Sequence, residues 1–263
     1  MFVELWTQEH ALAVLPSFAV MLALAFVLGK ALANKELKIR MIPLQVIACI
    51  LLVLEAGKQV VSFSRGYDLY HIPLHFCSLF IFVLPAMAFW KGKRAETVRG
   101  VTAALCCAVM LFMLIYPNLI YSPSDVASFF SDFMSFHTVT FHGLVMFAFV
   151  LIVALRLHTP QPKGEKRAIV IFMLCYCTIA AIMAQVLKTN FNNFYRCNIP
   201  PLESLRVAVE NALGYTVSQV MYVLIVIVLD VLFVLLSYWI YRAVYHIVHK
   251  TGRHTSCKQS VHS

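Results

Sequence analysis

The chain has 263 residues, of which 61% are hydrophobic and only 13% charged, and its formal net charge is +9. A soluble domain is about half apolar and a quarter charged, so this composition excludes a water-soluble globule and predicts one helical bundle embedded in lipid. The basic residues lie in short segments between apolar runs, and no basic helix carries stacking aromatic residues, which argues against nucleic-acid binding.

The N-terminal ten residues contain Glu4 and Glu9 but no Lys or Arg. They lack the basic segment of a cleaved signal peptide, so we expect the first apolar run to remain as a helix. The eight cysteines lie mostly inside apolar runs, where cysteine is usually a small hydrophobic side chain. Their spacing fits neither a disulfide framework nor a zinc site, and we expect no metal and no cofactor.

Seven apolar segments are long enough to cross a bilayer, which takes about 20 mostly apolar residues. They predict an all-α membrane protein with a single seven-helix transmembrane domain over residues 1–263, in which residues 242–263 form a basic cytoplasmic tail. The expected helices cover residues 10–33, 41–61, 72–90, 98–117, 134–156, 167–187 and 215–241. The two longer connections, residues 118–133 and 188–214, are expected to be loops.

The basic residues alternate between the two sides of this arrangement. Sixteen of the 21 Lys and Arg residues fall after the first, third, fifth and seventh helices, four in each segment. The opposite side has only five: Lys58, Arg65, Lys188, Arg196 and Arg206. Because cytoplasmic loops are enriched in Lys and Arg, the pattern predicts seven spans with the N-terminus outside and the C-terminus in the cytoplasm.

Several polar side chains fall within the expected helices, and each is a candidate functional residue because such groups are costly in lipid. Those in the outer half of the bilayer come from four helices: Glu55, Lys58, His75, Cys77, His137, His142, Asn190 and Asn192. Their common depth predicts a polar cavity that opens outward. The structural alternatives are an ion pair between Glu55 and Lys58 and, for the deeper Asp230, a hydrogen bond between helices.

Cys77 and a histidine are the pair with the clearest chemical potential, because a thiolate is a strong nucleophile when an imidazole takes its proton. His75 is two residues away and would not share a helix face with Cys77, so we expect the base to come from the helix over 134–156. His137 and His142 are five residues apart, and we expect only one of them to face Cys77. The alternative is a core cysteine with histidines that bond to backbone carbonyls.

Four stretches resemble the YwaF-like integral membrane proteins of bacteria, whose animal relative is transmembrane protein 164. Residues 72–79, Ile-Pro-Leu-His-Phe-Cys-Ser-Leu, are similar to the family signature Leu-Pro-Leu-(His/Glu)-Leu-Cys. The other three are the Phe-His and Phe-His-Gly steps at 136–143, the Thr-Asn-Phe-Asn segment at 189–192 ahead of Pro200 and Pro201, and Glu55 at an acidic position of the second helix. Asn190 stands where the family has glycine. Together with the seven-helix plan, the resemblance covers nearly the whole chain.

The resemblance implies transfer of fatty acyl groups among phospholipids by a cysteine that forms an acyl-enzyme. Carried over to this chain, the nucleophile is Cys77 and the general base His142, with His137 in reserve. His75, Glu55, Asn190 and Asn192 would bind substrate, the two amides by stabilising an oxyanion.

We therefore expect an acyltransferase or lipid hydrolase that acts on outer-leaflet phospholipid or lysolipid in a cell membrane, for which a bacterial plasma membrane fits best. The sequence leaves the oligomeric state open. The competing hypothesis is a small-molecule transporter or a lipid-binding membrane protein without enzymatic activity. In that case Glu55, Lys58, His142 and Asp230 would line a pathway.

Overall fold

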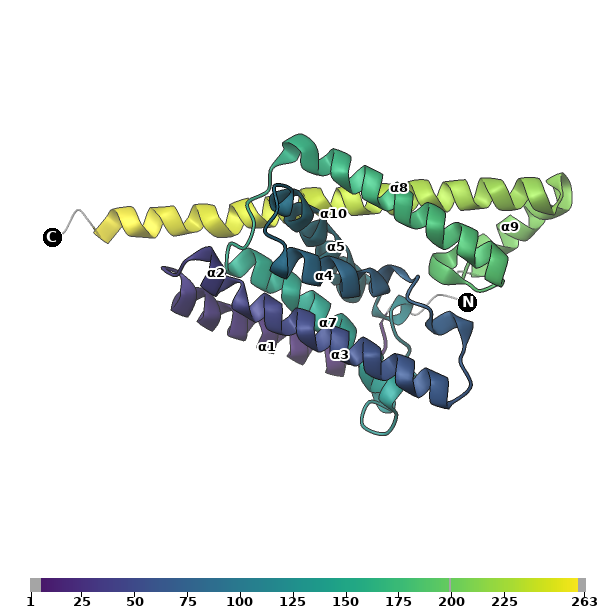
Figure 1. Ribbon diagram of the computed structural model, residues 1–263, viewed down its shortest axis with the longest axis horizontal. Coiled ribbons are helices and arrows are strands. Elements are labelled where there is room, and N and C mark those ends of the chain that lie inside the picture. Colours follow the sequence, from purple (N-terminus) through teal and green to yellow (C-terminus); the bar gives the residue numbers. More distant parts are fainter. Residues whose placement is uncertain (1–5, 199, 260–263) are drawn as a thin grey trace.

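The computed structural model describes residues 6–198 and 200–259, and within this part of the chain every regular element is a helix (Figure 1). The α-helices are α1 (Gln8–Leu32), α2 (Leu37–Arg40), α3 (Ile42–Ser64), α4 (Phe80–Phe89), α5 (Ala95–Ile115), α6 (Pro123–Ala127), α7 (Phe133–Ala154), α8 (Pro162–Leu187), α9 (Pro200–Leu213) and α10 (Tyr215–Gln259). Short 3₁₀ turns are η1 (Leu69–His71), η2 (Phe76–Leu79), η3 (Pro117–Leu119) and η4 (Phe191–Asn193).

Six segments of the described chain are long and apolar enough to cross a membrane: Gln8–Leu32, Leu37–Ser64, Ala95–Ile115, Phe133–Ala154, Pro162–Leu187 and Tyr215–Lys250. A further apolar helix, Phe76–Phe89, has 14 residues and is about 21 Å long. It is therefore shorter than the hydrocarbon core, which is about 30 Å thick. The prediction of an all-helical membrane protein is therefore confirmed, with six long apolar helices and one shorter one among the described residues.

The expected third helix, residues 72–90, is wrong in its first part. His75 has extended backbone angles (φ −74°, ψ 152°), and helical structure begins only at Phe76. Pro73 has no N–H to give to a helix and disfavours helical angles in the residue before it. The His75 ring also bonds through Nε2 to the carbonyl of Tyr70 at 2.9 Å, which holds the loop in place. This part of the expected span is therefore a folded loop.

Two further expectations need correction. Residues 200–213 form α9, although the sequence predicts a loop over the whole segment 188–214. Proline at the first helical positions stabilises this helix. So do two ion pairs of Arg206, with Glu203 at 2.8 Å and with Glu210 at 2.9 Å. The last helix does not end at residue 241, since α10 continues to Gln259 through most of the expected tail. Residues 260–263 of that tail lie outside the described residues.

The central helix of the bundle is α5, which is buried along most of its length and contacts α4, α7, α8 and α10. Small residues along it, among them Gly100, Ala104 and Ala108, let these neighbours approach closely. In Figure 1, α8 and α10 lie along one side of α4 and α5, and α1, α3 and α7 lie along the other. Apolar side chains remain exposed on the outside of the bundle, such as Phe26 at 62%, as expected for a surface that faces lipid.

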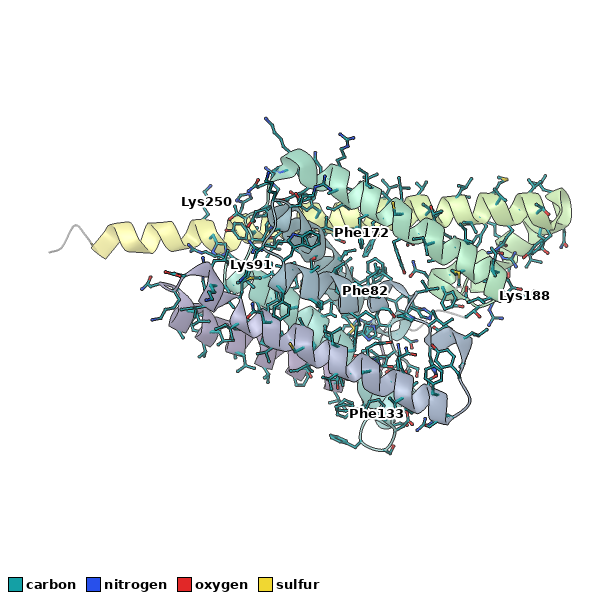
Figure 2. The ribbon with its side chains drawn as sticks, viewed as in Figure 1. Phe82, Lys91, Phe133, Phe172, Lys188 and Lys250 are labelled. Atoms are coloured by element: carbon teal, nitrogen blue, oxygen red, sulfur yellow. The ribbon has the colours of Figure 1, made fainter. Side chains whose placement is uncertain are left out.

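The two ends of the bundle differ in charge. Figure 2 places Lys91 and Lys250 toward one end and Lys188 toward the other. We call these the Lys91 end and the Lys188 end. The loops that carry four basic residues each are thus separated from the poorly charged connections, in agreement with the alternation in the sequence.

A buried polar cluster lies near the Lys91 end and consists of His158, Glu165, Tyr238 and Tyr241. We call it the His158 cluster. His158 Nε2 is 2.9 Å from Glu165 Oε1, Tyr238 donates to Glu165 Oε2 at 2.7 Å, and the Tyr241 hydroxyl donates to the His158 carbonyl at 3.0 Å. His158 Nδ1 lies 3.1 Å from that same hydroxyl. These bonds tie the loop before α8 to α10.

Candidate functional site

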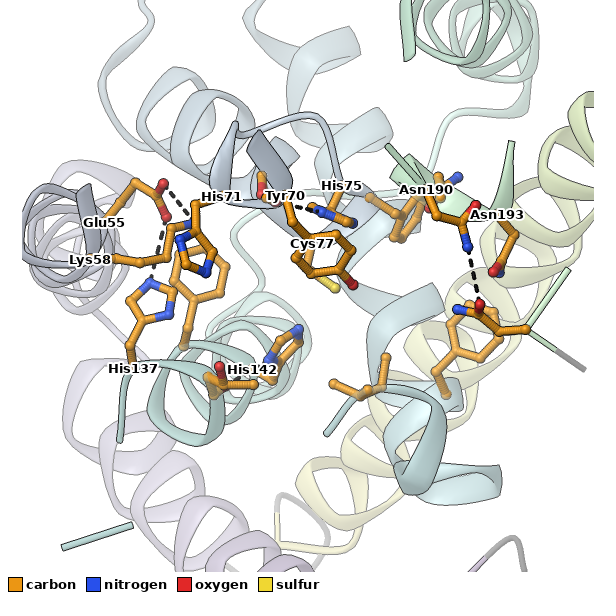
Figure 3. A pocket seen from close by; sticks show the side chains of 18 of the residues that line it. Glu55, Lys58, Tyr70, His71, His75, Cys77, His137, His142, Asn190 and Asn193 are labelled. Atoms are coloured by element: carbon orange, nitrogen blue, oxygen red, sulfur yellow. Dashed lines mark hydrogen bonds and ion pairs between the residues drawn. The ribbon is translucent and has the colours of Figure 1, made fainter. Parts of the chain in front are cut away.

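A cavity of about 370 Å³ lies toward the Lys188 end of the bundle (Figure 3). Its walls come from α3, the loop with η1 and η2, α7, η4 and α10. All seven residues expected to be catalytic or to bind substrate line it, as does Lys58: Glu55, His75, Cys77, His137, His142, Asn190 and Asn192. The structure therefore brings them together in one place, whereas their chemical roles stay predictions.

Glu55 forms the polar wall of the cavity on the side of α3. Its Oε1 accepts from Lys58 Nζ at 2.8 Å and from the Gln59 amide at 2.7 Å, and its Oε2 is 3.5 Å from His137 Nε2. The Glu55 and Lys58 side chains are only 9% and 12% exposed. The expected ion pair is present, and His137 is its third member.

His142 presents a free nitrogen to the cavity. Its Nδ1 is 2.6 Å from the carbonyl of Thr138, which can only accept, so Nδ1 carries the proton in the neutral ring. Nε2 then holds a lone pair, and it is buried with no hydrogen-bond partner among the described residues. The neutral ring in this tautomer has a lone pair on Nε2, which is the form that a general base must have.

Cys77 lies in η2, which continues directly into α4, so its sulfur is within the first turn of a helix. The reactive form of a cysteine is the thiolate, so attack by this sulfur requires a base that takes its proton. Figure 3 shows Cys77 and His142 on facing sides of the cavity. Within the described chain no hydrogen bond joins the Cys77 sulfur to either histidine of α7, although all three side chains line the cavity.

His75 is bonded to a backbone carbonyl through one ring nitrogen, as His142 is. Its Nε2 bonds to the Tyr70 carbonyl, and its ring packs against the Tyr70 ring with 4.2 Å between centroids. Sequence reasoning excluded it because His75 and Cys77 would occupy different faces of one helix. That reason is wrong, because residue 75 is not helical and both side chains line the same cavity.

On the opposite wall, the two asparagines expected to bind an oxyanion already have partners. The Asn190 oxygen accepts from the backbone N–H groups of Tyr195 and Arg196 at 3.2 and 3.1 Å, and its amide nitrogen donates to Asn198 at 3.0 Å. Asn192 Nδ2 donates to Asp230 Oδ2 at 2.8 Å. Each amide keeps one further N–H, but both side chains also fix the loop that carries them.

Asp230 makes the hydrogen bond between helices that its position predicts. The Cys177 thiol of α8 lies 3.8 Å from the same Oδ2 that Asn192 contacts. Asp230 also lines the cavity, so the carboxylate that joins the helices lies where a ligand could contact it.

Sequence reasoning missed several cavity residues, among them Tyr70, His71 and Asn193. His71 lay in an expected loop, and its Nδ1 lies 2.6 Å from the Ser62 hydroxyl of α3. Asn193 belongs to the run Asn-Phe-Asn-Asn that ends the sixth expected helix, but no feature of the sequence separates it from its neighbours.

The remaining lining of the cavity is largely apolar. The apolar part includes Phe112, Ile120, Met134, Phe141, Val226 and Phe233, and Ser78, Thr138 and Asn198 add polar groups. Polar groups on opposite walls with an apolar floor suit an amphipathic ligand, and the volume lies at the small end of the usual range of about 300–1,000 Å³ for ligand sites. In the part of the chain that the structure describes, no three His, Cys, Asp or Glu side chains gather as metal ligands would.

A model of the TMEM164 family matches residues 5–241, which include every residue named for the cavity. No curated protein and no solved structure gives a significant match. The match agrees with the resemblance through its animal relative, and it does not itself identify the bacterial YwaF-like branch.

Proposed function

Since the chain belongs to the TMEM164 family of membrane proteins, we propose that its cavity catalyses acyl transfer or hydrolysis on membrane phospholipids through an acyl-enzyme at Cys77. One observation carries this proposal. His142, whose Nε2 has no partner among the described residues, and Cys77 line one cavity whose polar and apolar side chains fit the ester region of a lipid.

In the first step His142 Nε2 takes the proton of the Cys77 thiol, and the sulfur attacks the carbonyl carbon of the ester. The bond from that carbon to the ester oxygen breaks, and the oxygen takes the proton from His142 as the lysolipid leaves. The acyl group stays on the sulfur as a thioester. A positioned base of this kind contributes about 10²–10⁴-fold to the rate.

In the second step an acceptor hydroxyl or water gives its proton to His142 and attacks the thioester carbonyl. The carbon–sulfur bond breaks, and the proton returns to the sulfur. The remaining amide N–H of Asn192 or Asn190 would donate to the oxyanion, an effect of about 3 kcal/mol for one well-placed donor.

The size of the cavity limits how a lipid fits. A volume of about 370 Å³ cannot contain a whole phospholipid, so the ester region occupies the cavity and the acyl chain leaves between helices toward the bilayer. The Glu55, Lys58 and His137 group then borders the polar part of the lipid, and Phe112, Phe141 and Phe233 border its apolar part.

The orientation in the membrane belongs to the same proposal. We infer seven passes, in which the loop at 69–75 and the helix Phe76–Phe89 together complete the third, with the N-terminus outside and the Lys91 end in the cytoplasm. The separation of Lys91 and Lys250 from Lys188 supports this orientation (Figure 2). The cavity then opens to the outer leaflet, in a bacterial plasma membrane if the YwaF-like resemblance holds.

Replacement of the nucleophile tests the proposal. Cys77→Ala is expected to abolish release of fatty acid and transfer to lysolipid while the thermal unfolding midpoint stays unchanged. Cys49→Ala is the control, because Cys49 lies on the exposed surface of α3 and does not line the cavity. Full activity of Cys77→Ala would remove the mechanism.

A transporter or lipid-binding protein is the second candidate, because Glu55, Lys58 and Asp230 line the same cavity as the histidines. Buried charged groups often mark a pathway through a membrane protein. A transporter should depend on Glu55 or Asp230 and tolerate Cys77→Ala, whereas an acyl-enzyme should lose turnover with Cys77→Ala. The same pair of variants therefore separates the two functions.

A further inference from the structure

Two basic side chains from different helices lie against one tryptophan ring near the Lys91 end. The Lys166 ammonium of α8 is 4.9 Å from the centroid of the Trp239 ring of α10, and the Arg242 guanidinium carbon is 5.2 Å from it. The ring lies at this end of the bundle because Tyr238, the residue before it, belongs to the His158 cluster. We call Lys166, Trp239 and Arg242 the Trp239 group.

Neither cation of the Trp239 group has a carboxylate to balance its charge. Among the described residues, no Asp or Glu forms an ion pair with Lys166 or Arg242. Glu165 precedes Lys166 in the chain, but both of its oxygens accept hydrogen bonds within the His158 cluster. Glu96, the acid of the loop before α5, is paired with Arg99. The acids near this end are therefore engaged elsewhere.

The rest of this end does not supply the missing negative charge. The sequence after Arg242 contains no Asp or Glu. Glu36 precedes α2, which packs against α3 on the other side of the bundle from α8 and α10 (Figure 1). Two like charges held against one ring repel each other, and an anion between them would turn this repulsion into attraction. The balancing anion must therefore come from outside the chain.

The surroundings of the ring indicate a lipid as the source of this anion. Trp239 is 44% exposed, and Leu232 and Leu236, which are seven and three residues earlier on α10, are each 55% exposed. This spacing places the three side chains on one face of the helix. Tryptophan is enriched at the membrane interface, and Lys and Arg near helix ends reach the level of the headgroups. The Trp239 group thus lies where a phosphate of the bilayer would be, above an apolar face for the acyl chains.

We propose that the Trp239 group binds the phosphate of an anionic phospholipid in the leaflet at the Lys91 end, which is the cytoplasmic leaflet in the inferred orientation. The guanidinium and ammonium groups donate to its oxygens. A zwitterionic lipid would bring its own ammonium group and so add a third positive charge, which disfavours it. This lipid lies at the end of the bundle opposite the cavity, so the inference is independent of acyl transfer.

The fluorescence of Trp239 itself provides the test. The chain has only three tryptophans, so Trp6→Phe and Trp90→Phe leave Trp239 as the single fluorophore. This full-length protein is placed in phosphatidylcholine nanodiscs that contain increasing fractions of brominated phosphatidylglycerol, whose bromine atoms quench a tryptophan in contact with them. Brominated phosphatidylcholine is the reference lipid. The two quenching curves give the affinity of the anionic lipid for the site relative to that of the zwitterionic one.

In the background with Trp239 alone, we expect phosphatidylglycerol to bind about tenfold more strongly than phosphatidylcholine. Lys166→Gln together with Arg242→Gln should reduce this preference to less than about twofold, and each substitution alone should reduce it about threefold. The matched control is Lys163→Gln with Arg167→Gln, which removes the same charge from exposed positions of α8 that have no contact with Trp239. The control should keep the preference.

An unchanged preference in the variant that lacks both cations of the Trp239 group would contradict this inference. An equal loss in the control would also contradict it, because it would indicate the general positive charge of this end rather than a site. Excess inorganic phosphate should lower the quenching no more than sodium chloride of the same ionic strength. A larger decrease would mean that the site binds a soluble phosphate and not a lipid. None of these results depends on acylation of Cys77, so the proposed function is tested separately.

Discussion

The cavity and the His158 cluster are both buried groups of polar side chains from several helices, but they differ in how their atoms are paired. In the His158 cluster both ring nitrogens of His158 and both oxygens of Glu165 have partners within 3.1 Å. In the cavity, His142 Nε2 and Asn193 Oδ1 have no partner among the residues that the structure describes, and His137 Nε2 has only the 3.5 Å contact with Glu55.

This difference separates a structural cluster from a site. Most buried polar atoms in proteins have hydrogen-bond partners, so unpaired ones need a reason. Five buried side-chain atoms of the described residues lack a partner, and three of them line the cavity. The other two are the Nε atoms of Arg40 at the end of α2 and Arg99 in the first turns of α5. The unpaired atoms, more than the polar residues themselves, indicate where a ligand binds.

The largest expected effect is chemical and falls in the cavity. His142→Gln should lower the rate of Cys77 acylation by about 10²–10⁴-fold, because the group that takes the thiol proton is lost. The unfolding free energy should fall by only about 0.5–1.5 kcal/mol, because the bond from Nδ1 to the Thr138 carbonyl is lost and Nε2 has no partner to lose. Stopped reactions followed by mass spectrometry give the rate. His137→Gln is the matched variant, and a larger loss there than in His142→Gln would reverse the assignment of the base.

The His158 cluster should show the opposite behaviour. Glu165→Ala removes the partner of His158 and of Tyr238 in a fully buried setting, and the expected loss is about 3–5 kcal/mol of unfolding free energy. Denaturant unfolding in detergent micelles measures it. Protein that stays folded should still acylate Cys77 at the normal rate. A stable variant with impaired acylation would show that the cluster belongs to the site.

A smaller effect is expected from crowding the same cluster. A Cβ on Gly100 would lie 2.6 Å from the Glu165 carboxyl carbon, so Gly100→Ala should cost about 1–3 kcal/mol. Gly29→Ala is the control in α1, where the nearest atom would be 3.6 Å from the new Cβ. Thermal melts of the two variants side by side decide the matter, and equal stability of both would mean that α5 has room to shift at this position.

The smallest expected effect concerns α9. Hydrogen bonds from Arg206 lower the pKa of Glu203 in the folded protein, so the interaction is present above the pKa of the unfolded chain and is lost as the pH falls through the lower folded value. The pair is partly exposed, so we expect about 0.2–1 kcal/mol. Unfolding curves from pH 7 to pH 3 should show less dependence in Glu203→Gln than in wild type. Identical curves would contradict this role.

Much of the fold follows from the sequence because lipid imposes simple requirements. Apolar length identified the six long helices, and the depth of Glu55, Cys77 and His142 along separate helices was enough to predict that they meet. The predicted depth of a residue in the bilayer changes little when a helix boundary is misplaced by a few residues. The depth of Cys77 was also predicted correctly despite the error at residue 75, because an extended loop that enters the bundle reaches the same level as a helix.

What the sequence could not show depends on contacts between distant residues. The loop at 72–75 is held by the ring of His75 on the Tyr70 carbonyl, and the His158 cluster joins residues more than 70 positions apart. The two prolines that begin α9 suggested a loop, although proline also suits the first turn of a helix. Pairing of individual atoms, which distinguishes Asn193 from Asn190, is invisible in a list of residue types.

The central claim is that Cys77 forms a thioester with a lipid acyl group, and intact-protein mass spectrometry tests it most directly. Purified protein is incubated with mixed phospholipids and divided into samples with and without hydroxylamine. We expect a fatty-acyl mass increment that hydroxylamine removes, and that Cys77→Ser either lacks or keeps as a stable ester. Absence of any adduct on the wild type across a broad panel of lipids would contradict the account and favour a transporter or lipid-binding protein.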